Sequence, residues 1–70
     1  MKVEVVDKTE EFIVLEVSAE GLPKKRTSIH IDSIADGRTT LEEQIELARA
    51  DGELRLARIN AMNATLGELG

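Results

Sequence analysis

Residues 41–66 read LEEQIELARADGELRLARINAMNATL, a helix-length segment with apolar side chains on two opposite sides. At helical spacing, one stripe contains Leu41, Ile45, Ala48, Gly52, Leu56, Ile59 and Leu66, with Met62 at its border. On the opposite side, a second stripe contains Leu47, Leu54 and Ala61, flanked by Ala50 and Ala57. A helix that is apolar on two sides is either sandwiched within its own domain or shared with another chain.

The start of this helix is marked by a turn and a capping motif. Asp36-Gly37 is typical of a turn, and Thr40 followed by Glu43 fits a capping box, so we expect the helix to begin near Leu41. A continuous helix over residues 41–66 would be about 39 Å long, whereas strands of six to nine residues reach roughly 20 to 30 Å. Either the helix end projects into a partner, or Asp51-Gly52 kinks or breaks the segment; both remain open.

The N-terminal half has the pattern of a β-hairpin. Residues 2–6 and 11–19 are rich in Val and Ile and flank a polar turn at residues 7–10. Pairing across that turn places Val5 opposite Phe12 and Val3 opposite Val14. The other face of the second strand then receives Ile13, Leu15 and Val17, as expected of a central strand that is covered on both sides.

A third strand is expected at residues 27–33, with Ile29 and Ile31 on one side. Gly21 and Pro23 should end the second strand, and Lys-Lys-Arg at residues 24–26 should form a solvated loop. The sequence therefore predicts a single small α+β domain over residues 1–70. In it, a three-stranded antiparallel meander is followed by a C-terminal helix, packed on the sheet through Leu41, Ile45, Ala48, Leu56 and Ile59.

Composition restricts how such a small domain can be stabilised. The chain has 70 residues, no Cys and a single aromatic residue, Phe12. Disulfides and thiolate metal sites are therefore excluded, and oligomerisation becomes the leading route to stability. The net charge of −5 disfavours general nucleic-acid binding. No run approaches the length of a membrane span, and the first twenty residues contain Glu4, Asp7, Glu10 and Glu11, which do not fit a signal peptide. We therefore expect a cytoplasmic protein with no membrane partner.

No residue pattern indicates catalysis. Ser28, His30 and Asp32 are the residue types of a hydrolytic triad, but side chains two apart on a strand are separated by nearly 7 Å, too far for proton transfer. A polar solvent face of an edge strand explains them. The sequence contains no glycine-rich phosphate loop, so we expect no catalytic residues, no cofactor and no small-molecule ligand.

The segment 32–43 resembles the calcium loop of EF-hands at four positions, which are Asp32, Asp36, Gly37 and Glu43. The resemblance implies a bound calcium ion held by carboxylate oxygens. It departs from the family where Ile34 replaces a ligand, and where a β pattern precedes the loop. A strand-to-helix turn followed by a capping box explains the same residues, so we expect no metal.

Residues 24–32, KKRTSIHID, look like the opening strand of ribbon-helix-helix repressors. That resemblance implies a dimer whose paired strands read the major groove. In that family a helix follows the strand almost at once, whereas here we expect a loop over residues 33–39. A full hairpin also precedes the strand, and the chain is acidic, so a ribbon-type DNA-binding regulator is only an alternative.

We therefore expect a non-enzymatic interaction or assembly module that acts as a homo-oligomer or binds another protein. Its expected partner-binding residues are Leu47, Leu54, Ala50, Ala57 and Ala61. Small acidic chains of this build resemble phage and prophage accessory proteins in general class. A further alternative is an acidic inhibitor that uses Glu42, Glu46 and Glu53 to occupy a nucleic-acid-binding site on another protein.

Overall fold

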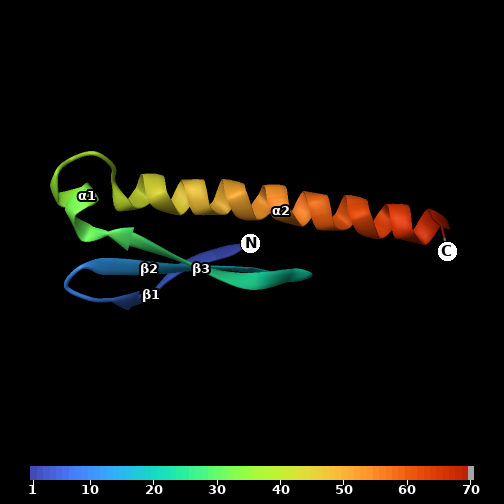
Figure 1. Ribbon diagram of the computed structural model, residues 1–70, viewed down its shortest axis with the longest axis horizontal. Coiled ribbons are helices and arrows are strands. Elements are labelled where there is room, and N and C mark those ends of the chain that lie inside the picture. Colours follow the sequence, from blue (N-terminus) through green and yellow to red (C-terminus); the bar gives the residue numbers. More distant parts are fainter. Residues whose placement is uncertain (70) are drawn as a thin grey trace.

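The expected α+β arrangement is confirmed by the computed structural model, which describes residues 1–69 (Figure 1). Three strands form one antiparallel sheet in the order β1-β2-β3, and a long helix, α2, lies across one face of it. The elements are β1 (Lys2–Lys8), β2 (Phe12–Ala19), β3 (Leu22–His30), α1 (Ile31–Ala35) and α2 (Leu41–Leu69).

Helix α2 continues without a break through Asp51-Gly52. Gly52 is buried against the sheet, and a Cβ atom placed there would lie 2.7 Å from Met1 Sδ and 2.8 Å from Val17 Cγ1. Glycine at this position therefore allows the helix to approach the sheet closely, and of the two alternatives for residues 41–66, the single helix is the correct one.

The core lies between the sheet and the N-terminal half of α2. Its buried side chains are Ile13, Leu15, Val17, Leu22 and Ile29. Partly buried apolar residues surround the cluster of Ile13, Leu15 and Ile29, namely Val3, Ile31, Ile34, Leu41, Ile45 and Ala48. The buried core is therefore entirely aliphatic. Phe12 lies on the opposite face of the sheet, where its ring is 4.5 Å from that of His30.

The predicted register of the first hairpin is wrong. Val3 pairs with Val17 and Val5 with Leu15, and the register shifts between Val5 and Asp7. The turn lies later than predicted because the Thr9 hydroxyl accepts hydrogen bonds from the amides of Glu11 and Phe12, at 3.3 and 3.0 Å. The bulge adds one residue, and a shift of one residue exchanges the two faces of a strand. Val3 consequently joins Leu15 and Val17 on the helix-facing side.

The third strand begins and ends earlier than predicted. Glu20-Gly21 forms a two-residue turn between Ala19 and Leu22, which are paired. Gly21 has a φ of 78°, the value required at the third position of a type II turn. Pro23 is accommodated because β3 is an edge strand, where a missing N–H can face solvent. The Lys-Lys-Arg run thus lies in a strand and not in a loop.

The chain turns from β3 directly into α1, so the expected strand position of Ile31 is wrong, and the expected loop at residues 33–39 is wrong for residues 33–35, which are helical. Residues 36–39 connect α1 to α2 without regular structure, as expected. Gly37, with a φ of 76°, lies just after this short helix, and its amide donates to the carbonyl of Ile34. The predicted start of α2 at Leu41 is confirmed. The Thr40 hydroxyl accepts a hydrogen bond from the Glu43 amide at 3.1 Å, while the Glu43 carboxylate accepts one from the Thr39 hydroxyl.

Candidate interaction surface

The expected partner-binding residues lie on one exposed face of α2, which we call the outer stripe: Leu47, Ala50, Leu54, Ala57 and Ala61. The Leu47 side chain is 62% exposed and the Leu54 side chain 53% exposed. The three alanines are exposed as well. Within the single chain, these apolar side chains therefore face solvent.

The outer stripe is exposed because the opposite face of α2 packs on the sheet. Leu41, Ile45 and Ala48 contact the core, and Gly52 is buried against Val17. A helix presents only one side to a single sheet, so residues about half a turn away face outward. The chain supplies no second layer among its described residues to cover that side (Figure 1).

The stripe is one residue longer than predicted from the sequence. Its members follow the alternating spacing of three and four residues that marks a helix-pairing seam. The same spacing reaches Ala64, which is also exposed. The spacing of apolar residues in the sequence was enough to predict that Ala64 belongs to the stripe. From Leu47 to Ala64 the stripe extends over about 27 Å of helix.

The C-terminal part of α2 projects beyond the sheet (Figure 1). All residues from Asn60 to Glu68, which we call the projecting end, are exposed, and the molecule measures 51 × 20 × 14 Å. Met62 and Leu66 continue the face of α2 that packs on the sheet, yet they are 63% and 60% exposed. The predicted overhang is therefore confirmed.

Charged side chains border the outer stripe on both sides. Glu46 and Glu53 follow one border and are exposed. Asp51 and Arg58 follow the other border. The Asp51 carboxylate is shared by Arg55, at 3.2 Å, and Lys25, at 3.7 Å. The ion pairs found among residues 1–69 leave Arg58 unengaged.

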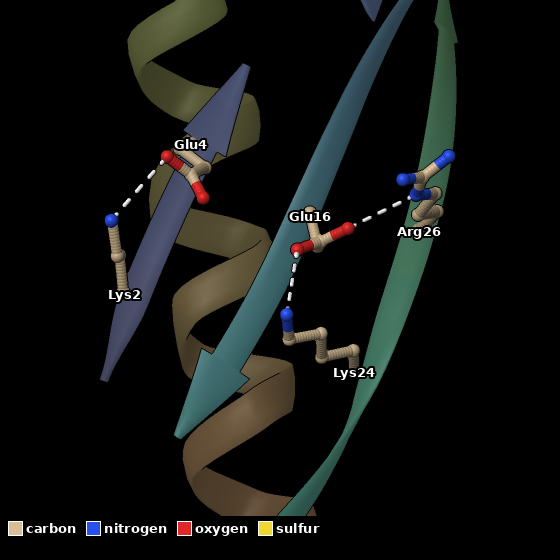
Figure 2. Close-up of polar contacts among 5 residues, drawn as sticks. All are labelled: Lys2, Glu4, Glu16, Lys24 and Arg26. Carbon is tan, nitrogen blue, oxygen red and sulfur yellow. Dashed lines mark hydrogen bonds and ion pairs between the residues drawn. The ribbon is translucent and has the colours of Figure 1, made fainter. Parts of the chain in front are cut away.

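Each basic residue of the Lys-Lys-Arg run forms an ion pair with an acidic residue of the same chain. Figure 2 shows Glu16, on the sheet face turned away from α2, between Arg26 at 3.0 Å and Lys24 at 3.9 Å. The Glu16 side chain is only 12% exposed, and Lys25 pairs with Asp51 on the other face. Although α1 follows β3 at once, as in ribbon-helix-helix proteins, these pairs counter the positive charge that a phosphate backbone would need.

The polar residues that suggested chemistry do not converge. Ser28 and His30 lie on β3, whereas Asp32 lies in α1, where its carbonyl accepts from the Asp36 amide. The Asp36 carboxylate pairs with Arg38 at 3.7 Å. No group of three or more His, Asp or Glu side chains in residues 1–69 is placed to hold a metal ion. Turn and cap interactions thus explain the residues that resemble a calcium loop.

An open cavity of about 220 Å³ separates β3 from α2. Four of its lining residues are aliphatic and four are polar or charged, including the Lys25–Asp51 ion pair: Leu15, Lys25, Thr27, Ile29, Gln44, Leu47, Ala48 and Asp51. Leu47 therefore belongs both to the outer stripe and to the rim of this cavity. The cavity extends the apolar surface of the outer stripe toward β3.

No helix in the described part of the chain is long and apolar enough to cross a membrane. Comparisons of the chain with models of protein families, with curated proteins and with solved structures found no match.

Proposed function

We propose that this protein is a non-enzymatic assembly module that forms a homo-oligomer through the outer stripe of α2. The observation that carries the proposal is the exposure of Leu47 and Leu54, at 62% and 53%, in line with three exposed alanines on one helix face. Aligned exposed leucines on a helix are typical of a face that packs against another helix.

The stability of the domain supports the same proposal. Five buried side chains make up the core of the described chain, and a domain of this size buries only about 60% of its unfolded surface. Full burial of a leucine side chain contributes about 1.5–3 kcal/mol. Covering the exposed parts of Leu47 and Leu54 in each copy would therefore contribute a few kcal/mol per pair of copies, a large fraction of the stability of a small domain.

The sheet edges are poor alternatives for self-association. β3 carries Pro23 and three consecutive basic residues. β1 has a bulge between Val5 and Asp7, and the strand begins and ends with a lysine. Proline, lysine and bulges on edge strands oppose pairing with another strand. Pairing of β3 with a second β3 would also bring the basic runs together. The helix face is thus the favoured surface for association.

Sedimentation equilibrium over a range of protein concentrations tests the proposal. The wild type is expected to associate, and Leu54→Glu to be a monomer with unchanged helix content, because a carboxylate at the stripe would have to be buried unpaired. Leu66→Glu is the matched control, since Leu66 is similarly exposed on the opposite side of α2. If Leu66→Glu dissociates the oligomer and Leu54→Glu does not, the outer stripe is not the interface.

A second candidate function is supported by the exposed acidic residues beside the stripe, Glu42, Glu46 and Glu53. These could occupy a basic nucleic-acid-binding site on another protein. Salt separates the two candidates: an inhibitor held by charge loses affinity steeply as ionic strength rises, whereas association through leucine and alanine side chains does not. Sedimentation of the protein at low and high salt directly measures whether its self-association depends on ionic strength.

A further inference from the structure

We infer that the partner on the outer stripe is a second copy whose α2 runs antiparallel, with the two-fold axis between Leu54 and Ala57. This inference rests on the proposed homo-oligomer and adds the orientation and register of the two helices. It follows from the sizes of the side chains along the stripe and from the charges that border it.

The first argument is the order of large and small side chains. Each leucine of the stripe is followed three residues later by an alanine, in the series Leu47, Ala50, Leu54, Ala57, Ala61 and Ala64. With antiparallel helices centred between Leu54 and Ala57, Leu54 of one copy faces Ala57 of the other, and Leu47 faces Ala64. Ala50 faces Ala61. In four of the six layers a large side chain thus meets a small one, and only the two Ala50–Ala61 layers are small on both sides, which permits close helix spacing.

The second argument is charge. In the antiparallel register, residues on the same border of the stripe face each other, so Asp51 of each copy lies beside Arg58 of the other. The pair is formed twice because of the two-fold symmetry. Arg58 is exposed, and the ion pairs within residues 1–69 do not use it. The Asp51 side chain is 53% exposed and can accept another donor.

A parallel, in-register pair is less favourable on both counts. Leu47 and Leu54 would meet their own copies, while the other four layers would contain only alanine and would be too small to fill the same spacing. On the borders, Glu46 would lie beside Asp51 of the other copy, a like-charge contact that offsets the attraction between Glu53 and Arg58, whereas the antiparallel pair gains the Asp51–Arg58 attraction without a like-charge contact. Parallel helices would also align their dipoles, whereas antiparallel helices oppose them.

Cysteine cross-linking tests the orientation, because the chain has no Cys of its own. Ala50→Cys and Ala61→Cys are prepared as separate variants and oxidised alone and as an equimolar mixture. A disulfide requires Cα atoms within about 7 Å. In the antiparallel pair, residue 50 lies beside residue 61 of the other copy, whereas the two residues 50 are offset by about 16 Å along the axis.

We expect little cross-linking of either variant alone and efficient formation of the mixed dimer. Self-cross-linking of Ala50→Cys without enrichment of the mixed species would overturn the antiparallel orientation and indicate a parallel pair. A reduced protein that sediments as an oligomer but gives no cross-link in any sample would overturn the register. A reduced protein that is a monomer at all concentrations would instead refute the proposed function, so the two failures are distinguishable.

Charge reversal gives a second, independent readout. Arg58→Asp places like charges at both Asp51 positions and is expected to weaken association on the order of tenfold. Adding Asp51→Arg in the same chain restores opposite charges in the antiparallel pair and should recover most of the affinity. Asp51→Arg alone separates the two orientations: it should weaken an antiparallel pair, where residue 51 lies beside Arg58, and strengthen a parallel pair, where residue 51 would lie beside Glu46. Stronger association of Asp51→Arg would contradict the proposed arrangement.

Discussion

At the scale of single residues, Gly52 shows how one position can oppose the preference of its own helix. Glycine costs about 1 kcal/mol relative to alanine inside a helix, yet it occupies the middle of the 29-residue α2. The reason is the contact with the sheet, where Met1 Sδ and Val17 Cγ1 occupy the space that a Cβ atom would need. Sequence alone could not separate this cause from a helix break, because both place glycine at the same position.

Gly52→Ala is expected to lower the free energy of unfolding by about 1–2 kcal/mol, because overpacking against the buried Val17 exceeds the gain in helix propensity. Gly67→Ala is the matched control: apart from its chain neighbours and the backbone of α2 itself, nothing lies within 4 Å of the added Cβ, so it should be neutral or slightly stabilising. Denaturant unfolding of both variants at one protein concentration measures the difference. Stabilisation by both substitutions would show that the helix lies further from the sheet than described.

At the scale of elements, the helix was easier to predict than the strands. The apolar spacing of α2 and its Thr40 cap predicted its start at Leu41. The strands depended on features with weak sequence signals: the bulge between Val5 and Asp7, and the two-residue turn at Glu20-Gly21. Pro23 and the basic run indicated a loop because edge strands and loops accept the same residues.

The start of α2 provides a test at this scale. Thr40→Ala removes the hydroxyl that accepts from the Glu43 amide, and it is expected to lower the free energy of unfolding by about 1 kcal/mol. Thr65→Ala is the control, since the Thr65 hydroxyl donates only to the carbonyl of Ala61 within the helix and alanine favours helix. Thermal unfolding followed by circular dichroism compares the two. A larger loss from Thr65→Ala would contradict the assigned cap.

At the scale of the whole molecule, the sequence predicted the candidate surface because the two apolar faces of the helix can be recognised without knowing the register of the strands. Leu47 and Leu54 were assigned to a face that the sheet does not cover, and both are exposed. The sequence could not indicate how far the sheet extends beneath α2. That limit depends on the length and twist of β2 and β3, which left Met62 and Leu66 uncovered.

Folding and association should be separable by truncation. A chain that ends at Asn60 lacks most of the projecting end, which is exposed throughout. Its free energy of unfolding is expected to lie within about 1 kcal/mol of that of full-length Leu54→Glu, a monomer in which association adds no stability. The truncated chain should also fail to associate, because it loses Ala61 and Ala64. A loss of several kcal/mol in chemical denaturation would show that the projecting end supports the fold.

The projecting end has a consequence for hydrogen exchange. In an isolated copy, the amides of residues 60–68 are protected only by helical hydrogen bonds near a free end, and such helix termini open readily. Once a second copy lies along the outer stripe, each opening must also disrupt that contact. Deuterium uptake in this segment should therefore slow as protein concentration rises, while uptake in β2 changes little. The C-terminal turns of α2 would thus report whether a second copy is bound, without any chemical modification of the protein.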